Sequence, residues 1–182
     1  RLPDAALSNA PLKRLLVFGL GYSASVIASE LREQGWTVQG TSGVALSLDD
    51  EERIRAALAK SSHVLSSVPP TEGADPVLDR YGDALEHGWL GYLSSTGVYG
   101  DTGGAWVDET APLGTGRRSA RAEADAAWLA RGTRVFRLPG IYGPGRSALD
   151  RVREDKAHRI DLPDQVFSRV HVADIASGVI AA

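Results

Sequence analysis

Short apolar runs alternate with segments of helical spacing along most of the chain. Runs typical of buried parallel strands lie at 14–19, 36–42, 63–68, 89–96 and 133–139. Segments with helical apolar spacing, terminal glycines or charges that suit the helix dipole lie between or after them, at 23–35, 49–60, 75–88, 117–132 and 147–155. This alternation predicts an α/β fold, with a doubly wound parallel sheet and helices on both of its faces.

Residues 1–12 and the segments after residue 139 have weaker hydrophobic patterns. Residues 140–146 are rich in glycine and predict a loop, 158–162 are a candidate short strand, and the last part of 167–182 has helical spacing. This last pattern reaches the chain end without a helix-stop signal, so we expect further residues after it. Residues 1–12 have no apolar core of a signal peptide and are expected to be an extension.

One place interrupts the alternation. A candidate strand at 44–48 follows the strand at 36–42 almost directly, although a parallel crossover needs about a dozen or more residues. Either the two segments do not pair in parallel, or residues are absent between Ser42 and Val44. The regularity of the remaining chain favours the second alternative.

Composition and charge narrow the classes of function. The net charge of −3 provides no electrostatic footprint for nucleic acid or an anionic membrane, and no apolar run approaches the roughly 20 residues of a membrane span. The chain has no cysteine, which excludes disulfides, thiolate metal sites and a cysteine nucleophile, and which fits a cytoplasmic protein. The four histidines have no metal-ligand spacing, so no metal is expected.

The loop between the first predicted strand and helix carries a G-x-G-x-x-A spacing. In a dinucleotide-binding loop, the first glycine allows the tight turn, the second admits a pyrophosphate, and the small third residue lets helix and sheet pack closely. The phosphates then lie on free N–H groups of the helix. The motif therefore predicts a Rossmann-type domain, with a ligand-free glycine turn as the alternative. The predicted cofactor-binding residues of this loop are Gly19, Leu20, Gly21, Tyr22, Ser23 and Ala24.

The end of the second strand bears on the choice of dinucleotide. An acidic residue about 20 positions after the motif would bind the ribose hydroxyl of NAD, but the segment TVQGTSG contains no Asp or Glu. Thr41 and Ser42 could instead donate to a 2′-phosphate. We therefore expect NADP, and NAD stays open.

Five segments together resemble a known family. In chain order they are FGLGYSA (18–24), LSSTGVYGD (93–101), DETAP (108–112), RLPGIYGPGR (137–146) and FSRVHVADIA (167–176). Their order and spacing resemble the extended or atypical short-chain dehydrogenases/reductases, the group of nucleotide-sugar epimerases and dehydratases, over nearly the whole chain. The resemblance implies one NAD(P)-binding domain over 1–182, with a C-terminal substrate lobe that starts around 158–182 and is largely missing.

The resemblance also implies roles for individual residues. Ser95 falls at the active-site Ser or Thr position and would hydrogen-bond the substrate. Arg169 and His171 would belong to the segment that closes the substrate side. Further cofactor contacts would come from residues beside the adenosine ribose and the nicotinamide, namely Val68, Pro69, Pro139, Gly140, Ile141 and Tyr142.

The chain departs from the family at its Tyr-x-x-x-Lys pair. The expected place, GTGRRSARAEA (114–124), contains no tyrosine, and the best alignment puts Arg117 and Arg121 at the two positions. Arginine stays protonated and is a poor general base, but Arg121 could still bind the nicotinamide ribose. Arg117 could bind an anionic substrate or be solvated. Tyr99 and Tyr142 could donate a proton or simply pack, so the predicted catalytic residues are Ser95, Tyr99 and Arg121.

Two main functions remain open. The first is an NAD(P)-dependent oxidoreductase, epimerase or dehydratase acting on a small or sugar-like substrate. The second is a dinucleotide-binding redox sensor or regulatory protein without turnover, since a fold does not fix a function. A third hypothesis is a module that binds a single nucleotide. The expected partners are a small-molecule substrate and, by analogy through helices 75–88 and 117–131, a second copy in a homodimer, with no nucleic acid or membrane.

Overall fold

The computed structural model describes residues 13–43, 45–71, 73–114, 119–158, 161 and 166–182 of the chain. Five parallel strands form the main sheet: β1 (Arg14–Phe18), β2 (Thr37–Gly40), β3 (His63–Ser66), β4 (Trp89–Ser95) and β5 (Arg134–Leu138). A second, two-stranded parallel sheet consists of β6 (Gly140–Tyr142) and β7 (Arg169–His171). The helices are α1 (Tyr22–Glu33), α2 (Glu51–Leu58), α3 (Pro76–Tyr81), α4 (Ser119–Leu129), α5 (Ala148–Arg153) and α6 (Val172–Ala181), with 3-10 turns η1 (Gly82–Ala84) and η2 (Thr96–Tyr99).

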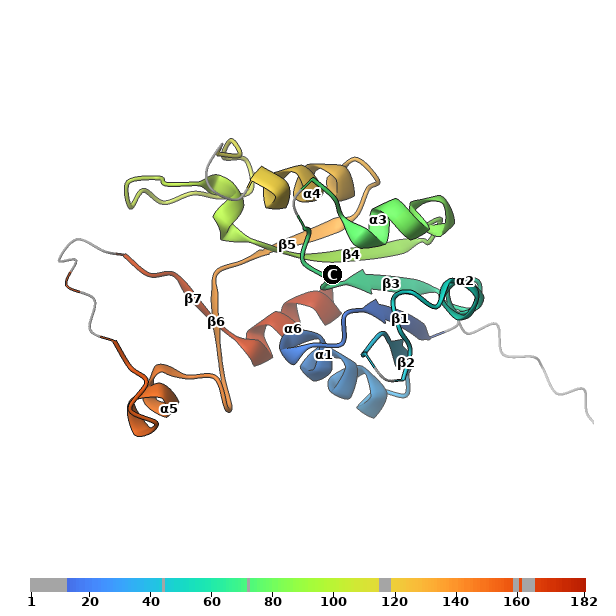
Figure 1. Cartoon of the computed structure of the whole chain (residues 1–182), viewed down its shortest axis with the longest axis horizontal. Coiled ribbons are helices and arrows are strands. Elements are labelled where there is room, and N and C mark those ends of the chain that lie inside the picture. The colour runs from blue at the N-terminus through green and yellow to red at the C-terminus, as the bar shows by residue number, and fades with distance from the viewer. Residues whose placement is uncertain (1–12, 44, 72, 115–118, 159–160, 162–165) are drawn as a thin grey trace, which may run out of the picture.

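Alternate residues of the main strands supply two hydrophobic cores, one on each face of the sheet. Leu16, Phe18 and Val64 pack with α2, α3 and α4, whereas Val17 and Leu65 pack with α1 and α6. Figure 1 shows α3 and α4 on one side of the sheet and α1 and α6 on the other. The predicted fold class, a doubly wound parallel sheet of Rossmann type, is therefore confirmed.

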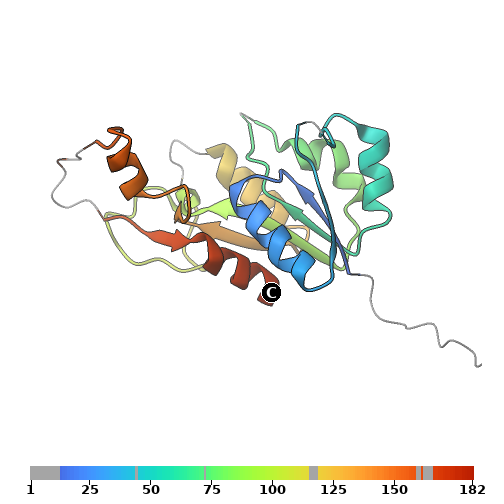
Figure 2. The same ribbon diagram turned by 90° about the horizontal axis from the view of Figure 1, so that it is seen from below.

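The strand order places the ligand crevice. The main sheet has the order β2-β1-β3-β4-β5, so the chain leaves β1 toward β2 and later returns to the other side of β1. Ligands of such open sheets bind beyond the carboxyl ends of the strands where the order reverses, here between β1 and β3. The small β6–β7 sheet and α5 lie beyond one end of the main sheet in both views (Figures 1 and 2).

Several local predictions need correction. Residues 140–146, predicted as a loop, contain strand β6, because they pair with residues 169–171, a distant partner that no local pattern shows. The helix predicted over 75–88 ends at Tyr81 and continues only as η1, where the carbonyl of Gly82 accepts a hydrogen bond from Arg131 (2.8 Å). The extension 1–12 and residues 159, 160 and 162 of the candidate strand 158–162 fall outside the described residues.

The candidate strand at 44–48 is wrong. After β2, the chain makes only an antiparallel bridge between Ser42 and Leu46 and then enters α2 through the N-cap Asp50. The two segments do not pair in parallel, which was the less favoured alternative. A crossover between them is therefore unnecessary, and β2 is the edge strand of the main sheet.

Helix α6 shares the core of the main sheet. Its buried residues Ile175, Ala176 and Val179 pack in the same cluster as Ile27 and Leu31 of α1. The C-terminal segment that was expected to open a substrate lobe thus covers one face of the sheet, and the boundary of such a lobe stays a prediction. Among the described residues, no helix combines the length and the apolar character that a membrane crossing requires.

His63 begins β3 between two tryptophan rings. Its imidazole lies edge-on to Trp36 (4.7 Å between ring centroids) and 5.7 Å from Trp89. Burial lowers the pKa of His63 below its ordinary value, and the electrostatic effects of Arg134 and His87 act in the same direction. The folded protein therefore favours the neutral imidazole.

This shift predicts a pH-dependent contribution to stability. As the pH falls through about 6.5, the unfolded chain binds a proton at this position that the folded chain does not, so the free energy of unfolding decreases toward the lower, folded pKa. In His63→Gln this part of the decrease should be missing, whereas His158→Gln, at an exposed histidine, should behave like the wild type. Urea denaturation at about pH 5.5 and about pH 7.5 measures it. Equal pH dependence in all three proteins would contradict the prediction.

Candidate functional site

The first glycine loop is fixed by the tips of the two neighbouring strands. The N–H of Gly19 donates to the Thr41 hydroxyl (2.7 Å), and the N–H of Leu20 donates to the Thr41 carbonyl (2.8 Å). The Ser67 hydroxyl, directly after β3, donates to the Gly19 carbonyl. Gly19 has a φ of +79°, a backbone conformation that strongly favours glycine. The loop is thereby held in one shape between β2 and β3.

The second glycine leaves the start of α1 open. Gly21 is the N-cap of the 12-residue helix α1, no side chain caps it, and the first turn contains no acidic residue. A Cβ built on Gly21 would meet no atom within 4 Å, so a ligand can approach this backbone. Ala24 is only 1% exposed and packs against the sheet, as the third position of the motif requires. The loop therefore fits a pyrophosphate.

The tip of β2 differs from expectation in one respect. Thr41 is only 6% exposed, and its hydroxyl oxygen accepts the Gly19 N–H. It therefore supports the glycine loop from inside, which does not match the exposed phosphate donor that was expected. Ser42 is exposed at the same tip, and no Asp or Glu occupies it.

The loops after β3 and β5 border the same crevice. Val68 is close to the glycine loop, since a Cβ on Gly19 would lie 3.1 Å from its Cγ2 atom. Pro69 follows it and is exposed. The register of β4 and β5 pairs Ser95 with Leu138, which brings Pro139 beside Ser95. Gly140 and Ile141 continue into β6.

Ser95 lies where β4 passes into η2. Its hydroxyl oxygen accepts the N–H of Gly97 (3.1 Å) and so caps the short helix that carries Tyr99. Ser95 and Tyr99 are both half-buried at the carboxyl edge of the sheet. The local sequence thus places the serine and the tyrosine on one compact turn.

A buried polar network behind this turn was missed at the level of sequence. The Ser94 hydroxyl donates to Asp125 of α4 (2.7 Å), and the same carboxylate binds Arg137 of β5 through two nitrogens (2.8 and 3.1 Å). Arg137 donates in turn to the Tyr99 oxygen (3.0 Å) and lies over its ring, 5.2 Å from the centroid. The available signal was an aspartate in the alanine-rich stretch AEADAAW.

The network leaves the Tyr99 proton available. The Asp125 hydrogen bond raises the pKa of Arg137, although burial opposes it, so the guanidinium stays charged. Because the Tyr99 oxygen accepts a hydrogen bond from this cation, its own O–H points elsewhere and can donate. The arrangement can therefore present a phenolic proton beside Ser95.

Arg121, at the family's lysine position, faces a different partner. Its guanidinium donates to the hydroxyl of Tyr92 (3.1 Å), a fully buried residue of β4. Burial raises the pKa of Tyr92, which keeps this phenol neutral. Arg117 lies outside the described residues.

Tyr22 and Tyr142 both contact other parts of the chain. The Tyr22 hydroxyl donates to the carbonyl of Pro144 (3.0 Å), and Tyr142, 44% exposed, meets the ring of His171 edge-on at 5.1 Å. Ser23 is buried within α1. The residues predicted from the sequence thus gather at one edge of the sheet, with Thr41 and Arg121 engaged in structural contacts.

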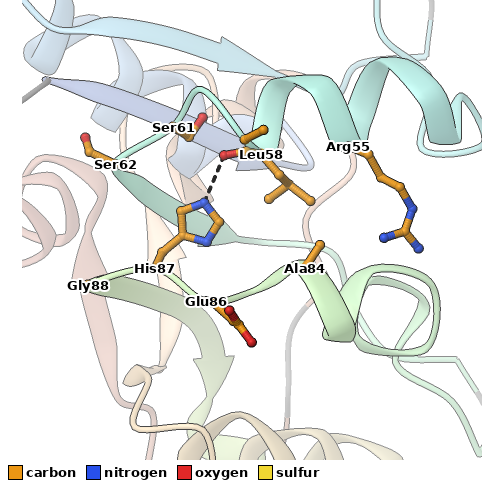
Figure 3. A pocket seen from close by; sticks show the side chains of 9 residues that line it. Arg55, Leu58, Ser61, Ser62, Ala84, Glu86, His87 and Gly88 are labelled. Carbon is orange, nitrogen blue, oxygen red and sulfur yellow. Dashed lines mark hydrogen bonds between the residues drawn. The ribbon is translucent and has the colours of Figure 1, made fainter.

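A pocket of about 430 Å³ lies away from this edge (Figure 3). It is lined by the end of α2 and by the segments that lead into β3 and β4, which places it at the amino ends of the strands. His87 points into it, with Nε2 donating to the Leu58 carbonyl (3.0 Å). It has no glycine loop, so the dinucleotide argument does not apply there. No cluster of metal-binding side chains occurs in the part of the chain that the structure describes.

The comparisons with known proteins agree with this fold. A functionally unknown conserved protein from Silicibacter pomeroyi DSS is 42% identical over 93% of this chain and 67% of its own, with a TM-score of 0.80. A UDP-glucose 4-epimerase from Stenotrophomonas maltophila, solved with NAD and formylated UDP-arabinopyranose, is 19% identical (92% and 72% covered, TM-score 0.72). An Agrobacterium tumefaciens protein of the short-chain dehydrogenase/reductase superfamily, solved with NAD, is 17% identical (92% and 72%, TM-score 0.63). No family model and no curated protein matches.

The buried ion pair makes a stability prediction. The side chains of Asp125 and Arg137 are 0% and 12% exposed, so Asp125→Ala leaves a charge without its partner and should lower the free energy of unfolding by about 3–5 kcal/mol. The double variant Asp125→Leu with Arg137→Met removes both charges and should be less destabilised than Asp125→Ala.

Urea denaturation measures both effects, with Glu123→Ala on the exposed side of α4 as the matched control, expected within about 0.5 kcal/mol of the wild type. If Asp125→Ala were as stable as this control, the network would not support the site.

Proposed function

We propose that this chain, which belongs to the same family as the functionally unknown conserved protein from Silicibacter pomeroyi, binds NAD(P) and acts on a small or sugar-like substrate. The chain has the fold of the short-chain dehydrogenases/reductases, the group that includes nucleotide-sugar epimerases. The observation that carries the proposal is the glycine loop. Gly19 is fixed by Thr41 and Ser67, while Gly21 leaves the start of α1 open to a pyrophosphate.

The residues of the loop would hold the cofactor in a defined direction. The free N–H groups at the start of α1 would bind the pyrophosphate, and the loop after β3, with Val68 and Pro69, would border the adenosine ribose. Pro139, beside Ser95, would begin the segment that lines the nicotinamide and continues through Gly140, Ile141 and Tyr142. A bound nicotinamide supplies a hydride acceptor or donor.

Ser95 and Tyr99 would bind the substrate oxygen and transfer its proton. The Ser95 hydroxyl would hydrogen-bond a substrate carbonyl or hydroxyl, since its oxygen accepts only one N–H and its proton remains available. Tyr99 would donate or accept the proton at the substrate oxygen, with Arg137 holding its oxygen from behind. This arrangement would substitute for the tyrosine that is absent from 114–124.

We infer NADP as the preferred dinucleotide. Ser42 is exposed at the tip of β2, and no carboxylate there would repel a 2′-phosphate. Thr41 no longer supports this inference as a direct ligand, because its hydroxyl is occupied inside the loop.

One observation favours dinucleotide binding without turnover as a second candidate. The Arg121 guanidinium donates to the Tyr92 hydroxyl, and this contact competes with a role on the nicotinamide ribose. A homodimer through α3 and α4 is a further proposal, and these helices are joined by the hydrogen bond from the Trp128 indole to Asp75 (2.9 Å).

Gly21→Val tests the cofactor site separately from the fold. Gly21 has a φ of −89° and open space around its would-be Cβ, so the variant should fold, with a loss of at most about 1 kcal/mol at the helix start. The valine side chain would occupy the space of the pyrophosphate and should weaken dinucleotide binding by about tenfold or more. Nicotinamide fluorescence during titration with NADPH and NADH measures the affinity. Wild-type protein that binds neither would overturn the proposed function.

Turnover across a panel of carbonyl compounds and sugar nucleotides separates enzyme from sensor. If the wild type turns over a substrate, Tyr99→Phe, which keeps the ring over Arg137, should slow the reaction by about a hundredfold or more. Ser95→Ala should also slow it, and Ser95→Thr should restore part of the rate. A loss in Tyr142→Phe with an unchanged rate in Tyr99→Phe would transfer the proton-donating role to Tyr142. Binding without any consumption would favour the sensor.

A further inference from the structure

We propose that Arg146 is an additional binding residue for the pyrophosphate of the dinucleotide, held in place by Tyr22 at the start of α1. The inference rests on the proposed function, because it concerns the ligand of the same glycine loop. The glycine motif does not include this residue, and the resemblance, whose segment 137–146 ends at Arg146, implied no role for it. What points to it is the way the turn between β6 and α5 is docked on the glycine loop.

The turn that carries Arg146 is rigid. Gly143 and Arg146 exchange two backbone hydrogen bonds (3.2 and 3.0 Å), and Gly145 between them has a φ of +69°, which favours glycine. Directly after it, Ser147 and Asp150 form a capping box that fixes the start of α5. Arg146 therefore projects from a defined backbone.

Tyr22 anchors this turn to the glycine loop. Its hydroxyl donates to the Pro144 carbonyl (3.0 Å), and Gly143 is so close that a Cβ there would lie 2.6 Å from the Tyr22 oxygen and 2.7 Å from Val172. Tyr22 is the first residue of α1, directly after Gly21. Since helical side chains tilt toward the helix N-terminus, the Tyr22 ring lies toward the glycine loop. Residues 121 positions apart in sequence, Tyr22 and Gly143, thus meet at the site.

The guanidinium of Arg146 completes the contact. Its central carbon lies 5.5 Å from the centroid of the Tyr22 ring, within the range of a cation–π interaction. Arg146 is exposed, and no carboxylate among the described residues forms an ion pair with it. A cation without an ion pair among the described residues therefore lies over the ring of the residue that follows Gly21.

The charges at this place call for an anion. The N-terminus of α1 carries a partial positive charge, its first turn contains no acidic residue, and the Arg146 guanidinium adds a full positive charge. The N-terminus of α1 and the Arg146 guanidinium repel each other, and an anion bound between them would offset this repulsion. A pyrophosphate accepts hydrogen bonds both from backbone N–H groups and from the planar guanidinium, so the same ligand satisfies both.

The test compares Arg146→Gln with Arg134→Gln. Arg134 is a matched control, since it is also exposed and lies over an aromatic ring (Trp89, 5.8 Å), but it begins β5 at the amino edge of the sheet. Calorimetry with NADPH, ADP and adenosine as probes separates the phosphate contribution. We expect Arg146→Gln to bind NADPH and ADP about tenfold more weakly and adenosine as the wild type does. Arg146→Lys should recover part of the loss, and Arg134→Gln should bind all three normally.

The failures of the two proposals are distinguishable. Wild-type protein that binds none of the probes overturns the proposed function and this inference with it. Wild-type binding of NADPH with equal affinity in Arg146→Gln overturns this inference alone. An equal loss for adenosine and ADP in Arg146→Gln also overturns it, because the residue would then support the shape of the loop and not the charge of the ligand.

Discussion

The hydrogen bond from the Gly19 N–H to the buried Thr41 hydroxyl is the contact on which the crevice depends. It joins the end of β1 to the end of β2, and the Ser67 hydroxyl joins the same glycine to the end of β3. Together with the parallel register of β1, β2 and β3, these contacts hold three strand ends at one edge, where α1 starts. The register of β3, β4 and β5 brings the following loops to the same edge. The site is a property of the sheet edge as a whole.

The sequence was sufficient for the fold because the signals are local. Apolar runs such as 14–19 and helical segments such as 23–35 report their own burial, and their alternation leaves few arrangements other than a parallel sheet. Where the prediction failed, the deciding interaction was distant. Strand β6 pairs with β7, and α3 ends where Arg131 donates a hydrogen bond to the Gly82 carbonyl. The residues next to β6 and α3 in the sequence do not indicate either contact.

The same distinction holds for the site. The glycine spacing located the loop that is proposed to bind the cofactor, and the turn with Ser95 and Tyr99 could be placed from its resemblance to a family. The sequence pattern could not show that Thr41 is buried, because a threonine at the end of a strand can be either exposed or buried. Nor could it pair Asp125 with Arg137, which are brought together only when α4 packs across β4 and β5. This buried ion pair places the Arg137 guanidinium against the Tyr99 oxygen, so the geometry of the turn depends on residues that lie behind it.

The edge position of β2 has a consequence for how such a chain can change over time. The order β2-β1-β3-β4-β5 corresponds to the six-stranded dinucleotide-binding order without its outermost strand. The short turn bridged by Ser42 and Leu46 is where a further strand and helix would enter, on the side of β2 that faces away from β1. Gain or loss of that strand and helix would change the edge of the sheet beside β2, while β1 and β3 would keep their pairing. A strand added beside β2 would therefore leave the pairing of β1 with β3 unchanged.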